Sequence, residues 1–126
     1  MTLKDNLYKI VDKKETPEGV LYDIHLIGES PIYGAHFPGM PITPGVCIVQ
    51  IVEELLSDYL QRNLQISSIK SAKFLLALKP SDDIIQILLS SVKQEKEKTT
   101  VQSTIKDYTG TIYSKISLTC NDIQTT

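Results

Sequence analysis

Residues 31–45 form a proline- and glycine-rich segment that excludes continuous helix or strand from this part of the chain. It holds four of the six prolines and three of the six glycines. Proline fixes φ and lacks a backbone N–H, so it interrupts both kinds of element. Apolar residues are interleaved with the prolines, namely Ile32, Tyr33, Phe37, Met40 and Ile42. They favour an ordered loop of defined shape over a disordered one.

One strong helix signal follows this segment, over residues 45–60. Thr43 fits the N-cap position and Pro44 fits the first helical position. The apolar residues of this run cover well over half of the helix circumference, and they are Val46, Ile48, Val49, Ile51, Val52, Leu55, Leu56, Tyr59 and Leu60. A helix with such a wide apolar surface is buried on several sides.

The rest of the chain reads as strands. Apolar runs typical of strands occupy residues 7–11, 20–27, 66–78, 84–92, 100–106 and 111–118. Turn residues lie at 16–19 and 107–110, and the charged run 93–98 is typical of a solvated hairpin loop. This order predicts a single α+β domain over residues 1–126, in which a long antiparallel sheet wraps around one helix. A second copy could continue the sheet, so we expect a dimer.

Charge and composition exclude several classes of protein. Thirteen Lys and Arg residues against fifteen Asp and Glu give a net charge of −2, which argues against nucleic-acid binding. No apolar run approaches the ~20 residues that span a bilayer, and residues 1–14 lack the apolar segment of a signal peptide. Cys47 and Cys120 do not have the spacing of a zinc or thioredoxin motif, which predicts two small buried hydrophobes in a reducing cytoplasm.

Two histidines are present, and one of them lies where a general base is expected. His25 is in a predicted strand and is interpreted as a surface or edge position. His36 lies in the proline-rich loop, close to the start of the helix. A histidine with a reference pKa of ~6.5 suits a general base. The alternative is a histidine that only hydrogen-bonds the loop backbone.

The start of the helix is the second place where chemistry is expected. Its first-turn N–H groups have no helical partner, and with the helix dipole they can polarise a carbonyl oxygen or stabilise an oxyanion. Gly45 would let a ligand approach this backbone closely, because it has no side chain. The alternative is that Pro44 and Gly45 only start the helix tightly.

The eleven residues 36–46, HFPGMPITPGV, resemble the H-F-P-G-x-P-[IV]-x-P-G-V signature of FabZ/FabA-type 3-hydroxyacyl-acyl-carrier-protein dehydratases. Residues 68–83 resemble the A-R-F-x-x-P-V-x-P-G-D stretch of that family. These proteins are hot-dog folds, a long sheet wrapped around one helix. The resemblance implies that His36 takes the proton from C2 of a 3-hydroxyacyl thioester and that the Gly45 N–H binds the thioester carbonyl. It also implies no metal or cofactor, an acyl carrier protein as partner, and a homodimer or an oligomer of dimers.

The resemblance further implies a path for the acyl chain, along the helix and the dimer seam. Val46 is expected to contact the substrate there, and Phe37, Met40 and Phe74 are candidates for the tunnel walls. Three lysines, Lys70, Lys73 and Lys79, are candidates for steering an acidic carrier protein; the alternative is that they are scattered solubilising residues. Strand alternation, moreover, puts Lys70 and Lys73 on opposite faces.

Position 50 departs from the family pattern. The second catalytic group of the family is a Glu or Asp fourteen positions after the histidine, and here that residue is Gln50. An amide cannot give or take a proton near neutral pH. Glu54, one helical turn later, could substitute, as could Glu53, or Gln50 could hold a water that relays the proton. Alternatively, the protein binds an acyl chain or supports an active partner subunit; a hot-dog thioesterase is less favoured. If Glu54 has none of these roles, we expect a solvated helix residue.

Overall fold

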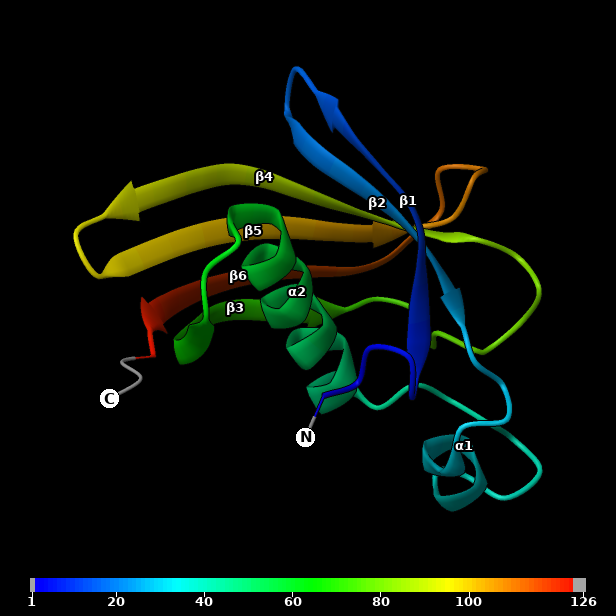
Figure 1. The fold of residues 1–126 in the computed structure, drawn as a ribbon. Coiled ribbons are helices and arrows are strands. Elements are labelled where there is room, and N and C mark those ends of the chain that lie inside the picture. Colours follow the sequence, from blue (N-terminus) through cyan, green and yellow to red (C-terminus); the bar gives the residue numbers. More distant parts are fainter. Residues whose placement is uncertain (1, 124–126) are drawn as a thin grey trace.

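The computed structural model describes residues 2–123, which form one antiparallel sheet and two helices (Figure 1). The strand order in the sheet is β1-β2-β4-β5-β6-β3. The sheet curves around α2, which crosses one of its faces, as the sequence predicted. The elements are β1 Tyr8–Thr16, β2 Gly19–Leu26, α1 Pro31–Ala35, α2 Gly45–Leu60, β3 Leu64–Phe74, β4 Ile85–Glu95, β5 Lys98–Lys106 and β6 Ile112–Asp122.

The hydrophobic core lies between α2 and the concave face of the sheet. Burial alternates along β2, where Val20, Tyr22 and Ile24 face the helix. Each fully buried aliphatic side chain contributes roughly 1.5–3 kcal/mol of transfer free energy, so this interface stabilises the position of α2. The helix contributes Ile48, Val49, Ile51, Val52, Leu55 and Leu56.

The start of α2 differs from the prediction in its cap. Pro44, with φ −60° and ψ 145°, is the N-cap, and Gly45 is the first helical residue. Thr43 is buried, and its hydroxyl lies 2.7 Å from the hydroxyl of Tyr33 instead of capping the helix. The predictions of Thr43 as the N-cap and of Pro44 as the first helical residue were therefore wrong. The Thr43 hydroxyl pairs with Tyr33, and Pro44 has the extended ψ of a cap residue.

Two strand ends also differ from the prediction. β3 ends at Phe74 rather than at residue 78, because the N–H groups of Leu75 and Leu76 both donate to the carbonyl of Tyr113 and the chain leaves the ladder. The charged run 93–98 is mostly strand, since Lys93 pairs with Thr100 across the β4–β5 hairpin. Only the tip of this run is a turn.

The proline-rich segment is ordered, as predicted, and contains the short helix α1, which the prediction missed. Ser30 is its N-cap, with the side chain accepting a hydrogen bond from the Ile32 N–H at 3.4 Å. Pro31 takes the first helical position. A serine followed by proline is a helix-start signal, so the sequence did carry the information for α1.

Candidate functional site

The first turn of α2 lies in an apolar groove of about 360 Å³. Gly45 and Phe74 both line this groove, together with residues 42–44 and 75–78 and Ile48. A Cβ on Gly45 would lie only 2.9 Å from Cζ of the Phe74 ring, so the absence of a side chain lets the ring cover the helix start. In the first turn, the N–H groups of Gly45 and Val46 have no helical acceptor, whereas that of Cys47 donates to the Pro44 carbonyl at 3.0 Å. An apolar acyl group with a terminal carbonyl suits such a groove chemically.

The other residues predicted to contact the acyl chain are exposed. Val46 follows Gly45 on the helix and is 75% exposed. Phe37 and Met40 lie in the loop between α1 and α2 and are also exposed, with reciprocal backbone hydrogen bonds between them. Phe37 and Met40 do not line the groove at Gly45, whereas Phe74 does.

His36 is exposed at the end of α1. Its backbone N–H donates to the carbonyl of Ile32 and its carbonyl accepts from the Ile42 N–H, each at 3.0 Å. The imidazole meets the Phe37 ring edge-on, with the ring centroids 6.1 Å apart. His36 lines neither the apolar groove nor the cavity beside Gln50. His25 is half-buried on β2, opposite Lys9, and also lines neither cavity.

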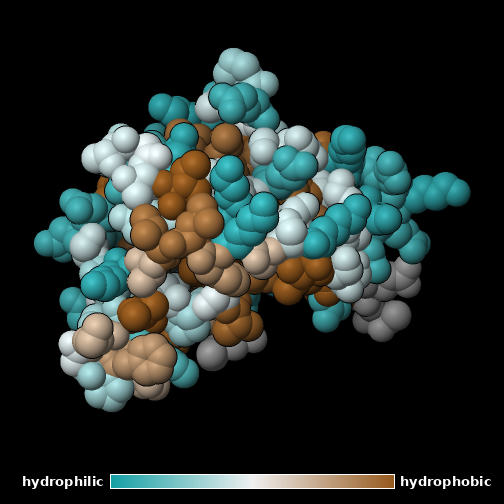
Figure 2. Space-filling view, turned by 180° about the vertical axis from the view of Figure 1, so that it is seen from behind, coloured by the Kyte–Doolittle hydropathy of each residue, from teal (hydrophilic) through white to brown (hydrophobic). Residues whose placement is uncertain are grey.

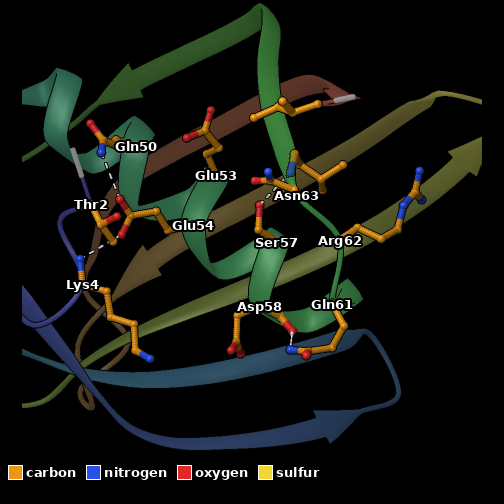
Figure 3. Close-up of a pocket in the computed structure, with 12 residues that line it drawn as sticks. Thr2, Lys4, Gln50, Glu53, Glu54, Ser57, Asp58, Gln61, Arg62 and Asn63 are labelled. Atoms are coloured by element: carbon orange, nitrogen blue, oxygen red, sulfur yellow. Dashed lines mark hydrogen bonds between the residues drawn. The ribbon is translucent and has the colours of Figure 1, made fainter. Parts of the chain in front are cut away.

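A larger polar cavity, of about 670 Å³, follows one face of α2 (Figure 3). The N-terminal segment and residues 61–64 complete its wall. Gln50 and Glu54 come together here: the Gln50 amide Nε2 donates to Glu54 Oε2 at 2.9 Å. The spacing of one helical turn predicted this proximity.

Glu54 is not a solvated helix residue, so that prediction was wrong. Its carboxylate also accepts hydrogen bonds from the backbone N–H groups of Leu3 and Lys4 and from the hydroxyl of Tyr8, at 2.8–2.9 Å. The sequence does not indicate these three partners, because all of them lie some 50 residues before Glu54 and two of them are backbone N–H groups, which form no motif. Glu53 accepts from the N–H of Ile66 at 2.8 Å and so holds the start of β3.

Burial changes the acidity of the tyrosines and cysteines around α2. Burial, together with the charge of Glu54, raises the pKa of the Tyr8 phenol far above its ordinary value, so this hydroxyl stays protonated and donates. The hydroxyl of Tyr22 likewise donates to Asp58 Oδ2 at 2.6 Å. Burial, together with this hydrogen bond, raises the pKa of the Tyr22 phenol. Burial also raises the pKa of both free thiols, that of Cys120 to about 11. The chemistry of a nucleophilic cysteine is therefore disfavoured at both.

Lys70 and Lys73 lie on the same face of the sheet, contrary to the prediction. A β-bulge between Ile69 and Ser71 shifts the alternation of side chains. Both lysines consequently line polar grooves that share Ser117. Figure 2 views the molecule from behind, where hydrophilic side chains surround a hydrophobic patch.

The part of the chain that the structure describes has neither a metal-binding group of side chains nor a helix that could cross a membrane. No three His, Cys, Asp or Glu side chains are grouped so as to hold a metal ion. Neither helix has the length and hydropathy needed to cross a membrane.

Comparison with known proteins connects this geometry to a family. A model described as ApeI-like, ApeI dehydratase, matches residues 12–116. The chain belongs to the ApeI-like dehydratases. Two curated FabZ 3-hydroxyacyl-[acyl-carrier-protein] dehydratases are similar to this ApeI-like protein. That of Levilactobacillus brevis is 28% identical over 116 residues, covering 82% of this chain and 78% of the relative. That of Fusobacterium nucleatum is 31% identical over 81 residues, covering 60% and 57%. A dehydratase-like function follows from these relationships.

Solved structures with the same fold include dehydratases and thioesterases. The dehydratase heterocomplex ApeI:P from Xenorhabdus doucetiae matches with a TM-score of 0.70 and 18% identity, over 90% of this chain and 96% of that chain. A hypothetical thioesterase from Streptococcus pneumoniae with coenzyme A matches with a TM-score of 0.64 and 18% identity, over 92% and 85%. At such identities the likeness establishes the fold alone, and it confirms the predicted hot-dog fold.

Proposed function

We propose that this ApeI-like protein dehydrates a 3-hydroxyacyl thioester, carried on an acyl carrier protein, to the trans-2-enoyl thioester. The observation that carries the proposal is the position of Gly45 in the apolar groove, at the start of α2. There the thioester carbonyl can accept from a first-turn N–H while the acyl chain contacts apolar side chains. The HFPGMPITPGV segment supports the same assignment. We place the reaction in fatty acid or related lipid or polyketide synthesis in the cytoplasm, where free thiols such as Cys47 and Cys120 persist.

In the proposed reaction His36 takes a proton from C2. The electron pair of that C–H bond forms the C2–C3 double bond, and the C3–O bond breaks. Charge that develops on the thioester oxygen is stabilised by the Gly45 N–H and the dipole of α2. The departing hydroxyl receives the proton that His36 took from C2, relayed through a water held by Gln50. One water therefore leaves, His36 returns to its neutral form, and no proton is gained or lost overall.

A homodimer is part of the proposal, because His36 and Gln50 do not line one cavity within a single chain. β3 is an edge strand whose side chains are exposed along most of its length. Ile69 is 52% exposed although it pairs with the buried Leu118, and Phe74 is 50% exposed. An exposed edge with uncovered apolar side chains favours pairing with a second copy. His36 of one copy would then complete the site beside α2 of the other.

A second candidate function follows from Gln50. With an amide at this position, the protein could bind the acyl chain and support an active partner subunit. The ApeI:P protein from Xenorhabdus doucetiae is described as a heterocomplex, which gives this candidate a precedent among proteins of the same fold.

Turnover of defined thioesters distinguishes the two candidates. The purified protein is incubated with 3-hydroxyacyl carrier-protein thioesters of several chain lengths, and the enoyl product is measured by mass spectrometry. His36→Ala is expected to lower the rate by about 10²–10⁴, the usual contribution of a general base. His25→Ala is the matched control, because this half-buried histidine lies away from the groove. Absence of turnover at every length from folded wild-type protein would refute the dehydratase and favour the partner subunit.

A further inference from the structure

Four lysines gather on the outer face of the sheet, which is the face away from α2 and the side viewed in Figure 2. They line two adjoining polar grooves of about 330 and 240 Å³, which share Gln102 and Ser117. The other residues that line these grooves are uncharged, so no carboxylate balances the positive charge there. All four side chains are exposed, and together they are called the lysine face: Lys70 and Lys73 of β3, Lys93 of β4 and Lys115 of β6.

The register of the strands puts two of these lysines directly opposite each other. Lys115 lies between two buried residues of β6, so its side chain points away from the core, and its partner on β3 is Lys73. Like charges at directly opposed positions of an antiparallel pair destabilise the sheet. The ion pairs among residues 2–123 are those of Lys13 and Arg62, so neither lysine of this pair is neutralised. The fold gains nothing from the pair, whereas an anionic partner is attracted by it.

The extent of the lysine face favours a protein over a small anion. The neighbouring strands are β4, β5, β6 and β3 in that order, so β4 and β3 are three strand spacings apart. At about 4.8 Å per spacing the lysine face extends over roughly 14 Å across the strands, more than one phosphate or carboxylate group can contact. The net charge of −2 argues against nucleic acid. Several carboxylates spread over a protein surface match both the extent and the charge.

We infer that the lysine face is the docking surface for an acidic protein, namely the carrier of the acyl thioester. This inference rests on the proposed function and adds the place where the carrier binds. Lys73 is followed directly by Phe74, which lines the apolar groove at Gly45. A carrier on the lysine face therefore lies beside this groove, and its thioester arm enters past Phe74. Pairing of two copies through β3 leaves the lysine face open, because it uses the edge of the strand and not its faces.

Charge reversal at the like-charge pair tests docking separately from the chemistry. Turnover is measured with one 3-hydroxyacyl group carried either on the carrier protein or on pantetheine, which lacks an acidic surface. Lys73→Glu/Lys115→Glu is expected to lower kcat/KM for the carrier substrate at least tenfold at low ionic strength, through KM, and to leave the pantetheine substrate unchanged. Added salt is expected to reduce the difference between variant and wild type.

The matched control is Lys9→Glu/Lys14→Glu, which makes the same change of charge at two exposed lysines of β1 that line neither groove. It is expected to change kcat/KM for either substrate by less than about threefold. Lys73→Glu alone gives a second readout, because it turns the like-charge pair into an opposite-charge pair. The unfolding midpoint is expected to rise while use of the carrier substrate falls. A change in stability alone would show that Lys73 serves the sheet and not the carrier.

The outcomes separate docking from the proposed function. Equal losses with both substrates, or no loss with either, would overturn the docking surface while the dehydratase stands. If the wild-type protein turns over neither substrate, the proposed function fails, and docking is judged from calorimetric binding of the 3-hydroxyacyl carrier protein. Weaker binding in Lys73→Glu/Lys115→Glu than in the control supports docking, whereas equal binding or none overturns it. Loss of binding to anionic phospholipid vesicles with unchanged carrier binding would assign the lysine face to a membrane surface and also overturn the inference.

Discussion

Gly45→Ala tests whether the glycine at the start of α2 serves the substrate or only the packing of Phe74. An ideal Cβ at this position lies 2.9, 3.1 and 3.2 Å from Cζ, Cε2 and Cε1 of the Phe74 ring. Carbon atoms pack best at about 3.5–4.0 Å, so the ring must retreat by roughly 0.5 Å. Phe74 is half exposed and the contact is at the end of its side chain, which allows this movement.

The expected effect on stability is small. Displacing the ring from its rotamer costs about 0.5–1.5 kcal/mol. Alanine is favoured over glycine within a helix by about 1 kcal/mol, which offsets most of that cost. The free energy of unfolding, measured in urea, is therefore expected to stay within about 1 kcal/mol of the wild-type value.

The expected effect on turnover is large, because the new methyl group occupies the approach to the first-turn N–H. Loss of one oxyanion donor lowers kcat by about 10²–10³, and this is the loss expected in the 3-hydroxyacyl carrier-protein assay. Gly45→Ala combined with Phe74→Ala is the control, since removing the ring restores activity only if the displaced ring caused the loss. A folded Gly45→Ala protein with kcat/KM within about threefold of wild type would refute the assignment of this N–H to the thioester carbonyl.

Two further predictions concern alkaline stability and assembly. Burial, with a smaller contribution from the charge of Glu53, raises the pKa of the Cys120 thiol from 9.0 to about 11. Between these values the unfolded chain loses a proton that the folded chain keeps, so stability falls as the pH rises, by up to roughly 1.4 kcal/mol per pH unit. Urea unfolding at about pH 8 and about pH 10 is expected to show a smaller fall for Cys120→Ala, and an equal fall would contradict the assignment. Ile69→Asp on β3 is expected to convert the proposed dimer to a monomer in sedimentation, whereas Val11→Asp, at a similarly exposed position on the opposite edge strand, leaves it intact. A dimer that persists in Ile69→Asp would show that β3 is not the seam.

The helix, and the order of helix and strands along the chain, could be predicted because periodicity records which face of an element is buried. The predicted helix 45–60 has the bounds of α2, since its apolar positions are the ones that pack on the sheet. The end of the strand predicted over residues 66–78 was harder to predict, because the whole run has the composition of a strand. Residues 75–78 serve the start of α2 instead, and the Leu78 carbonyl accepts from the Thr43 N–H at 2.8 Å. Local pattern alone does not distinguish these two uses of an apolar run.

The candidate site was predictable only where it depends on side-chain identity. The spacing of Gln50 and Glu54 predicted that they meet, and they do. The other partners of Glu54 include two backbone N–H groups, which every residue but proline has and no motif can indicate. The shared face of Lys70 and Lys73 was missed for a related reason, since a bulge is a property of strand pairing rather than of one strand.

Gln50→Glu tests whether position 50 can supply a proton to the leaving hydroxyl. Gln50→Glu would put a second carboxylate within about 3 Å of Glu54, judging from the present amide contact of 2.9 Å. Two carboxylates this close cannot both ionise easily, so the pKa of one is raised well above the ordinary ~4.3 of glutamate. Because Glu54 already accepts hydrogen bonds from the N–H groups of Leu3 and Lys4 and from the hydroxyl of Tyr8, the proton is expected on the carboxyl group introduced at position 50. That group could then protonate the departing hydroxyl directly. We expect kcat to rise by about 10² or more, with a rate that declines as the pH passes the raised pKa. If the rate does not change in a folded variant, the proton for the leaving hydroxyl does not come from this position.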